Sequence, residues 1–241
     1  MDAADRSLSL RLAVAAVLSV VLLVPFALLW ALVAGNWAPL HVLDAGVTDG
    51  LHGFSLAHPD WVEAMAVWSY AFDPNVWRLG ALVLVIWLLR RGAAPVAWWV
   101  VITMTLGGML GALLKLLVGR DRPDLLEPVA RATGFSFPSG HALNSALGAG
   151  VFLLVLLPFT GGRPGRRIAL WAVVVAVPLV TGLCRIGLGV HWTSDVMAGW
   201  LLGVAVVATT AAGYEAWRRR SGRRPVDVPG EGVEPEVASH A

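Results

Sequence analysis

Two segments of this chain hold histidines and an acid in spacings that suit nucleophilic attack on a phosphate. His191 and Asp195 lie four residues apart, so the two side chains share one face of a helical turn. A carboxylate bonded to one imidazole nitrogen fixes the tautomer and leaves the other nitrogen free to attack. His141 follows Pro138-Ser139-Gly140 at the expected start of a helix, where Ser is a preferred N-cap and free N–H groups favour phosphate. Together these segments predict a phosphate site.

Three cations near the ends of apolar stretches extend this candidate site. Lys115 is the only lysine beside 17 arginines, and Arg122 and Arg185 also fall at or just beyond the ends of such stretches. A charge near the hydrocarbon boundary costs on the order of a few kcal/mol unless it is paired or snorkels, so each is a functional candidate. Each one alone is more simply explained as a snorkelling side chain. If the three converge, they require an oxyanion.

The residues alone leave plainer interpretations open. Pro138–His141 could be a simple helix cap, and His191 with Asp195 could be a polar helix entry at a membrane interface. The two histidines and Asp195 could also ligate zinc, although three neighbouring cations disfavour a metal ion. The single Cys184 excludes an intramolecular disulfide and any zinc site with two or more Cys ligands.

The elements that must position these residues are helices in a membrane. The chain has 241 residues, of which 57% are hydrophobic and 14% are charged, whereas soluble domains have about 25% charged residues. This composition excludes an ordinary soluble fold and predicts an all-α polytopic membrane protein, a six-transmembrane-helix bundle. A helix needs about 17–25 residues to cross a bilayer. Six stretches qualify: Leu12–Ala34, Asn75–Arg91, Ala94–Val118, His141–Pro158, Ile168–Cys184 and Val196–Trp217.

Arginine placement orients the predicted bundle. Six spans place 12 of the 18 basic residues on one face, which is therefore cytoplasmic and carries both termini. We expect residues 1–11 to be a cytoplasmic N-terminus, residues 12–217 the membrane domain, and the charged residues 218–241 a disordered cytoplasmic tail. The first stretch is longer than the apolar core of a secretory signal, about 7–15 residues, and should be a retained helix. The outward face holds Arg78, Lys115, Arg120, Arg122, Arg131 and Arg185.

The first outward connection, Gly35–Pro74, mixes apolar and polar residues and is expected to form short amphipathic helices in the membrane interface. Its histidines and aspartates match no metal signature, so we expect a solvated loop for His41, Asp44, Asp49, His52, His58 and Asp60. Gly107-x-x-x-Gly111 and Gly199-x-x-x-Gly203 predict close contacts between helices.

The predicted topology brings the candidate residues to one end of the bundle. Lys115–Arg122 lies at the outward end of the third span, and Ser139–His141 starts the fourth there. Arg185 ends the fifth span and His191–Asp195 enters the sixth at that same end. Four helix ends therefore meet at one depth, facing the outside of the cell (inner) membrane.

The three motifs resemble a known signature. Lys115-x6-Arg122-Pro123, Pro138-Ser139-Gly140-His141 and Arg185-x5-His191-x3-Asp195 are similar, in type and order, to the type 2 phosphatidic acid phosphatase superfamily. That superfamily includes bacterial membrane lipid phosphatases, glucose 6-phosphatase and vanadium haloperoxidases. The resemblance covers residues 94–217, with motifs at 115–123, 138–141 and 185–195. One departure is Cys184, where the family often has Ser before the Arg.

The resemblance implies a role for each residue. His191 is the nucleophile that forms a phosphohistidine, Asp195 supports it, and His141 is the general acid and then the base. The implied phosphate-binding groups are Lys115, Arg122, Ser139, the Gly140 N–H and Arg185. Three cations and a helix N-terminus stabilise phosphoryl transfer by charge and position, so we expect neither a metal nor a cofactor.

The expected substrate is a lipid phosphate or diphosphate, of the undecaprenyl diphosphate, phosphatidic acid or phosphatidylglycerophosphate type. The expected partners are this substrate and membrane lipids, with no nucleic acid. A transporter or channel with an anion site is an alternative, but its ionisable residues should lie near the midplane on broken helices. A non-lipid phosphatase or a peroxidase of the same family, and a structural membrane protein, are further alternatives.

Overall fold

The protein folds into helices throughout its described part. The computed structural model describes the backbone of residues 3–221 and the side chains from Val17 onward, except those of 18, 19 and 219. Within this range every regular element is helical, which confirms the predicted all-α class. The elements are α1 (Ala3–Ala34), α2 (Ala38–Ala57), α3 (Pro59–Ala71), α4 (Pro74–Arg90), α5 (Ala94–Val118), α6 (Gly140–Leu156), the 3-10 helix η1 (Leu157–Thr160), α7 (Pro164–Gly187) and α8 (Thr193–Arg220).

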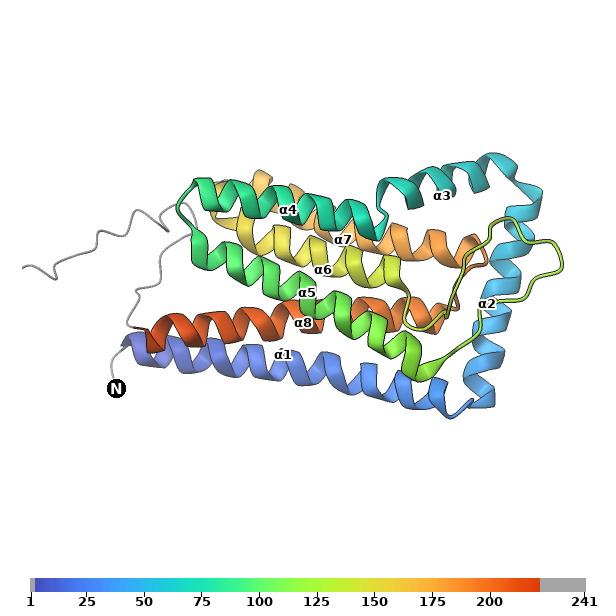
Figure 1. The fold of residues 1–241 in the computed structure, drawn as a ribbon, viewed down its shortest axis with the longest axis horizontal. Coiled ribbons are helices and arrows are strands. Elements are labelled where there is room, and N and C mark those ends of the chain that lie inside the picture. The colour runs from blue at the N-terminus through green and yellow to red at the C-terminus, as the bar shows by residue number, and fades with distance from the viewer. Residues whose placement is uncertain (1–2, 222–241) are drawn as a thin grey trace, which may run out of the picture.

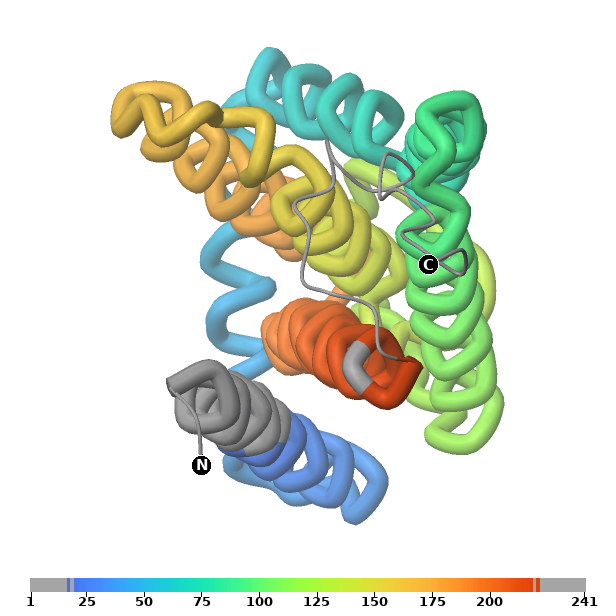
Figure 2. Tube along the Cα trace, turned by 90° about the vertical axis from the view of Figure 1, so that its left-hand side faces the viewer, coloured from blue at the N-terminus to red at the C-terminus, as the bar shows by residue number. Residues whose placement is uncertain are grey.

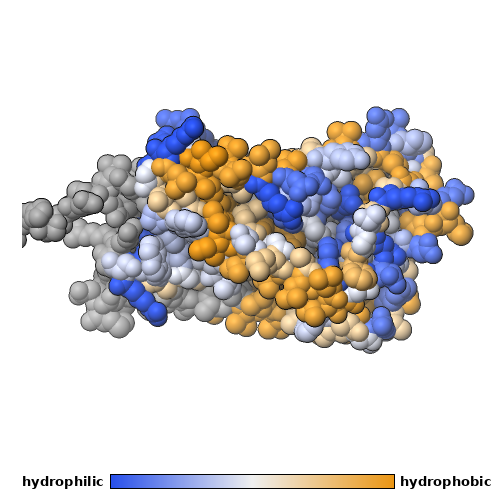
Figure 3. Space-filling model, in the orientation of Figure 1, coloured by the Kyte–Doolittle hydropathy of each residue, from blue (hydrophilic) through white to orange (hydrophobic). Residues whose placement is uncertain are grey.

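The long helices form a bundle that is apolar enough to cross a membrane. Five segments qualify among the described residues, and a sixth does if Val20–Ala34 and Ala38–Ala57, which meet at 95°, form one broken span. In Figures 1 and 2, α1 runs beside α8, and α2 turns across one end of the bundle. Hydrophilic residues gather toward the end where α2 lies (Figure 3). The chain is therefore a multi-pass membrane protein.

Proline and glycine set most helix ends close to where the sequence predicts them. Helix α4 starts at Pro74, because the side chain of Asp73 caps it by accepting a hydrogen bond from the Asn75 N–H at 2.8 Å. Helix α5 has the predicted bounds and stops at Gly119, whose φ of 61° favours glycine.

Two outer boundaries differ from expectation. Helix α1 begins at Ala3, nine residues before the predicted start of the first span at Leu12, and α8 continues to Arg220, beyond the predicted end of the membrane domain at residue 217. The remainder of the predicted disordered tail, residues 222–241, lies outside the described residues.

Helix α6 is the centre of the bundle, and small residues of α8 let it approach closely. A Cβ added at Gly199 would lie 2.8 Å from the Ser139 carbonyl oxygen, and one at Gly203 would lie 2.8 Å from that of Leu143. Gly107 and Gly111 of α5 meet leucine side chains of α6 in the same way. The predicted close helix contacts are confirmed, and they hold the first two turns of α6 against the second and third turns of α8.

Helix α2 reverses the usual pattern of burial. Its buried face is a polar stripe (Asp44, Thr48, His52 and Ser55). Its exposed face carries apolar side chains: Val42, Leu43, Val47, Leu51, Phe54 and Leu56. The expectation of a solvated loop is therefore wrong for Asp44, which is 0% exposed, and for His52, at 8%. The reason is that the polar face meets polar groups of the bundle, whereas the outer face suits lipid.

Candidate active site

The three sequence motifs meet at the end of the bundle that α2 covers. The loop after α5, the start of α6, the end of α7 and the turn before α8 all lie there (Figure 1). The backbone N–H of Ser139 donates to the carbonyl oxygen of Asp195 at 3.0 Å, which joins the second motif directly to the third. Arg122 contacts the ring of His191, which joins the first motif to the third.

His191 lies in the turn that precedes α8, with Asp195 behind its ring. The Nδ1 atom is 3.5 Å from Oδ2 of Asp195, and the His191 side chain is 3% exposed. The same Oδ2 accepts the Trp192 backbone N–H at 2.9 Å, while Oδ1 accepts from Arg120 at 2.7 Å. The carboxylate is thus held by two firm donors and faces the imidazole at a distance that is long for a hydrogen bond. Catalytic hydrogen bonds are often long without substrate.

Arg122 fixes the tautomer of His191. Its Nη1 atom lies 3.2 Å from Nε2 of the ring, and the same nitrogen donates to the Val190 carbonyl at 2.6 Å. A guanidinium carries donors only, so Nε2 must present its lone pair and the ring proton must sit on Nδ1, facing Asp195. In this tautomer the lone pair of Nε2 faces Arg122 and the site of the three motifs.

The ring of His191 is neutral at neutral pH. Burial lowers the pKa of His191 from 6.5 to about 3, and the charges of Arg122 and Arg185 act in the same direction. Asp195 opposes this shift without cancelling it. Because the ring is neutral, the lone pair of Nε2 is available for attack across the physiological pH range.

Lys115 and Arg122 converge on one carbonyl group. Nζ of Lys115, in the last turn of α5, donates to the Phe135 oxygen at 2.7 Å, and Nη2 of Arg122 approaches the same oxygen at 3.4 Å. Arg122 also donates to the carbonyl oxygens of Gly134 at 2.8 Å and Thr133 at 3.1 Å. The two cations are therefore side by side over the loop that leads into α6.

The site also contains polar groups without a protein partner, on Arg185 and Ser139, and open space beside Gly140. Within the described residues, Nε of Arg185 and Oγ of Ser139 are buried without a hydrogen bond. Ser139 occupies the N-cap position of α6, but its side chain does not cap the helix, contrary to the usual role of Ser there. A Cβ added at Gly140 would meet no atom within 4 Å. These groups leave donors available for a ligand at the start of α6.

His141 has an acidic partner that the sequence did not suggest. Its Nε2 atom lies 3.6 Å from Oδ2 of Asp73, the residue that caps α4. Asp73 precedes a proline at a helix start, a pattern that capping explains fully, so nothing in the sequence marked it as a partner. The carboxylate is suited to hold a proton on the imidazole of His141.

Arg120 and Asp44 are two more residues that sequence reasoning missed. Arg120 donates to Asp195 Oδ1 and to Asp44 Oδ2, each at 2.7 Å. Arg120 was predicted only as one of six outward cations, and Asp44 was assigned to a solvated loop. The spacing of the polar stripe of α2, a helical repeat of polar residues in an otherwise apolar helix, is the signal that could have identified Asp44.

The zinc alternative does not fit the geometry. Among the residues that the structure describes, no group of three or more His, Cys, Asp or Glu side chains could hold a metal ion. His141 and His191 each face a different carboxylate, Asp73 and Asp195. The site is instead rich in cations and donors, which is the environment of an oxyanion.

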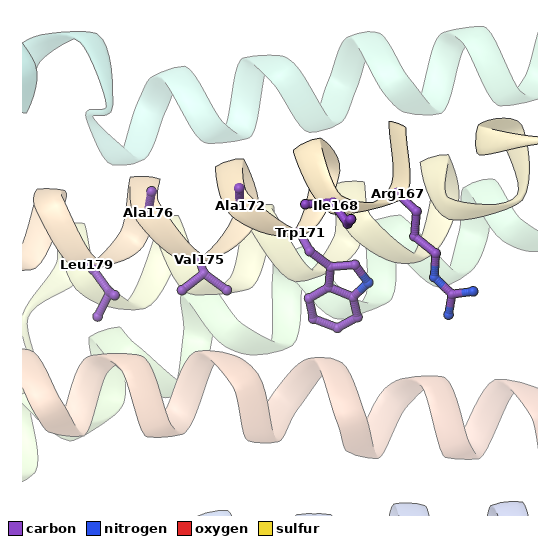
Figure 4. Close-up of a pocket in the computed structure, with 7 residues that line it drawn as sticks. All are labelled: Arg167, Ile168, Trp171, Ala172, Val175, Ala176 and Leu179. Atoms are coloured by element: carbon purple, nitrogen blue, oxygen red, sulfur yellow. The ribbon is translucent and has the colours of Figure 1, made fainter. Parts of the chain in front are cut away.

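A surface groove elsewhere on α7 is unrelated to this site. Figure 4 shows its lining, which is apolar apart from one arginine: Arg167, Ile168, Trp171, Ala172, Val175, Ala176 and Leu179. All seven belong to the part of α7 that precedes its last two turns, whereas Arg185 lies in the last turn. The exposed apolar side chains suit contact with lipid.

Comparison with known proteins identifies relatives of the part that carries the motifs. Residues 96–219 match the sequence model of the PAP2 superfamily. Phosphatidylglycerophosphatase B of Bacillus subtilis is 38% identical over 99 residues, which are 40% of this chain and 47% of that protein. Undecaprenyl-diphosphatase of Sulfolobus acidocaldarius is 32% identical over 123 residues, 48% of this chain and 54% of that protein. The chain thus spans about half the length of these curated relatives.

A solved structure shares the fold over most of the chain. The crystal structure of a transmembrane PAP2 type phosphatidylglycerolphosphate phosphatase from Bacillus subtilis superposes with a TM-score of 0.65. The match covers 83% of this chain and 98% of that one, at 23% sequence identity. The likeness extends beyond the segment matched by the family and includes α-helices that precede it.

Proposed function

This chain belongs to the PAP2 superfamily, and we propose that it is a membrane phosphatase that hydrolyses a lipid phosphate or diphosphate through a phosphohistidine. One observation carries the proposal: Nε2 of His191 presents its lone pair to the same space as the guanidinium of Arg122, with Asp195 behind the ring. A nucleophile in contact with a phosphate-binding cation is the arrangement that phosphoryl transfer requires.

In the first step, Nε2 of His191 attacks phosphorus. The N–P bond forms while the bond from phosphorus to the leaving oxygen breaks, and His141 gives its proton to that oxygen. Asp195 stabilises the positive charge that the ring acquires. Arg122, which contacts Nε2 at 3.2 Å, moves onto the nonbridging oxygens as the phosphate enters.

In the second step, water replaces the histidine. His141, now neutral, takes a proton from the water as its oxygen attacks phosphorus, and the N–P bond breaks to restore Nε2. The charge on the phosphate oxygens is met in both steps by Lys115, Arg122 and Arg185, with the Ser139 hydroxyl and the Gly140 N–H. These groups supply the charge that a metal ion provides in other phosphatases, so we propose that turnover is metal-independent.

The substrate is an amphiphile whose head enters the site while its tail lies between helices. The names of the relatives, a phosphatidylglycerophosphatase and an undecaprenyl-diphosphatase, support a lipid headgroup. Undecaprenyl diphosphate, phosphatidic acid and phosphatidylglycerophosphate share this chemistry. The apolar outer surface of the bundle (Figure 3) supports access from the bilayer.

The enzyme resides in the cell membrane with its site on the outer face and both termini in the cytoplasm. Helix α1 begins and α8 ends at the end of the bundle opposite to α2 (Figure 1), and the basic residues Arg90, Arg91 and Arg163 lie in or beside helix termini at that end. An excess of arginine marks the cytoplasmic side, which supports this orientation. The membrane domain of residues 12–217 then carries the whole site.

The test is phosphate release by the purified chain in detergent, from a panel of lipid phosphates and diphosphates and one water-soluble phosphomonoester. We expect release from lipid substrates that resists a chelator, is inhibited by vanadate and is absent in His191→Ala. An acid-labile phosphoenzyme should be trapped in the native chain only. No release from any substrate would favour an anion transporter, loss of release on chelation would refute the metal-free mechanism, and turnover by His191→Ala would refute the nucleophile.

A further inference from the structure

Helix α2 contacts the turn that carries the proposed nucleophile, His191. The polar stripe of α2 consists of Asp44, Thr48, His52 and Ser55, and three of these residues, Asp44, His52 and Ser55, lie against residues 187–194. Oγ of Ser55 donates to the Gly187 carbonyl at 2.9 Å, and Nδ1 of His52 would lie 3.8 Å from a Cβ added at Gly189. The stripe belongs to a segment outside residues 96–219, the part of the chain that matches the family.

Asp44 is the strongest contact of this stripe. Its Oδ1 accepts the backbone N–H of Ser194 at 2.9 Å, and its Oδ2 accepts the Ser194 hydroxyl at 2.5 Å and Nη2 of Arg120 at 2.7 Å. The carboxylate is 0% exposed. A buried carboxylate is costly unless it is paired and hydrogen-bonded, and here three donors satisfy it.

Arg120 connects this carboxylate to the one behind the nucleophile. Its Nη1 donates to Asp195 Oδ1 at 2.7 Å and to the Ser194 hydroxyl at 2.7 Å, while Nη2 binds Asp44. Its guanidinium also lies 5.4 Å from the centre of the Trp192 ring. One cation is therefore shared between two buried carboxylates, and the three side chains form a fixed unit.

The charge balance of this unit has a consequence for the ring of His191. If Arg120 had Asp195 as its only acidic partner, it would neutralise the carboxylate that faces Nδ1 of His191. Because Asp44 binds the other side of the guanidinium, the unit keeps one net negative charge beside the ring. Attack through Nε2 makes the ring positive, so this charge stabilises the transition state more than the resting enzyme.

We propose that Asp44 is a positioning residue of the phosphatase: it holds Arg120 and compensates its charge, so that Asp195 keeps its negative charge for His191. The inference rests on the proposed function. It assigns an electrostatic role in the reaction to α2, because Arg122, a proposed phosphate-binding cation, already contacts the other nitrogen of the ring, Nε2. Without compensation, Arg120 would add to the charge of Arg122 and oppose a positive ring.

The test compares Asp44→Asn with matched variants in the purified full chain, using one lipid phosphate that the native chain hydrolyses. Asp49→Asn is the surface control, because Asp49 is an exposed aspartate of the same helix. Ser194→Ala removes hydrogen bonds of the same network and changes no charge. Asp44→Asn with Arg120→Gln removes both the compensating carboxylate and the cation that it compensates. The kcat, KM, inhibition constant for vanadate and thermal midpoint are measured for each.

We expect Asp44→Asn to lower kcat roughly 10- to 100-fold, the range typical for groups that tune a reacting side chain through a partner. KM should stay unchanged, and vanadate, a phosphate analogue that we expect to bind at Nε2, should bind more weakly by a similar factor. The double variant should regain part of the lost kcat, because removal of the cation restores the charge beside His191. Ser194→Ala should cost much less than Asp44→Asn, and Asp49→Asn nothing.

Four results would overturn the proposal. A double variant that is slower than Asp44→Asn, or a Ser194→Ala variant that loses as much kcat, assigns Asp44 a structural role only. An Asp44→Asn variant that has a lowered thermal midpoint but native kcat in the folded fraction also assigns Asp44 a structural role only. If the native chain releases no phosphate and binds no vanadate, the proposed function itself fails, and this inference falls with it.

Discussion

Replacement of Asp195 by Asn is the sharpest test of the nucleophile and its partner. The new amide must place its NH₂ group where either Oδ1 or Oδ2 now lies. At the Oδ1 position it would face Nη1 of Arg120, a donor 2.7 Å away. At the Oδ2 position it would face the Trp192 N–H, a donor 2.9 Å away, and Nδ1–H of His191. The first orientation therefore opposes one donor and the second opposes two.

In the second orientation the imidazole can relieve part of this conflict only by changing its tautomer. If the amide NH₂ faces Nδ1, the ring proton moves to Nε2, where it meets Arg122 at 3.2 Å and blocks the attacking lone pair. In a serine-protease triad the equivalent change from Asp to Asn lowers kcat by about 10⁴ through the wrong tautomer. We expect a loss on the order of 10³–10⁴ in kcat here, with a smaller change in KM.

The assay is initial-rate phosphate release with a short-chain lipid phosphate, together with trapping of the phosphoenzyme. Asp121→Asn is the matched control, because Asp121 is exposed and contributes only its backbone carbonyl, to Ser136 and to Trp192. Phosphoenzyme formation should slow in Asp195→Asn and stay native in Asp121→Asn. A folded Asp195→Asn chain with native kcat would refute the assigned tautomer and with it the role of Asp195.

Three further predictions follow from the geometry. Asp73→Asn should lower kcat more for an alkyl phosphate than for a nitrophenyl phosphate, because the charge of Asp73 favours the protonated form of His141, the proposed acid for a poor leaving group; an equal loss on both substrates would contradict this. The ¹³Cε1 signal of His191 should not titrate between pH 8 and 5, because burial lowers its pKa from 6.5 to about 3. Between pH 6.5 and 3 the unfolded chain therefore binds more protons at His191 than the folded chain does, so the free energy of unfolding should decrease as pH falls through this range. A His191 ring that titrates near pH 6.5 would contradict the buried environment. Gly203→Ala should lower the free energy of unfolding by about 1–3 kcal/mol through overpacking, because its Cβ would lie 2.8 Å from the Leu143 oxygen. Gly213→Ala is the control, because a Cβ there would meet no atom within 4 Å. Equal thermal midpoints of the two variants would contradict the close packing of α6 and α8.

The sequence predicted the helices well because local signals mark their ends. Pro74 starts a helix together with the capping side chain of Asp73, Gly119 ends one through its backbone geometry, and long apolar stretches have no other stable form in a bilayer. The meeting of Lys115, Arg122 and His191 also followed from the sequence, because a helix that crosses a membrane fixes which end each residue occupies. Their individual roles stay predictions that the experiments above address.

The sequence did not predict the polar partners that the first part of the chain supplies. Asp44 and Arg120 are 76 residues apart, and no local pattern connects them. The rule that polar residues face outward is valid for a helix in water, and it misassigned Asp44 because the outer face of α2 is apolar and the inner face meets the bundle. The sequence did not indicate Asp73 as a partner of His141, because helix capping already explains an aspartate before a proline.

Both histidines of the candidate site face a carboxylate, and the two carboxylate systems draw on the segment that precedes the family match. Asp73 faces His141 directly, whereas Asp44 reaches His191 through Arg120 and Asp195. The segment matched by the family supplies the groups suited to hold phosphate, and α2 and the N-cap residue of α4 supply the charges suited to control protons and positive rings. The charge of the phosphate-binding cations favours substrate binding, whereas the charge of the carboxylates Asp44 and Asp73 lowers the energy of the transition state only. Substitutions of Asp44 and Asp73 should therefore act on kcat, and substitutions of Lys115 should act on KM as well.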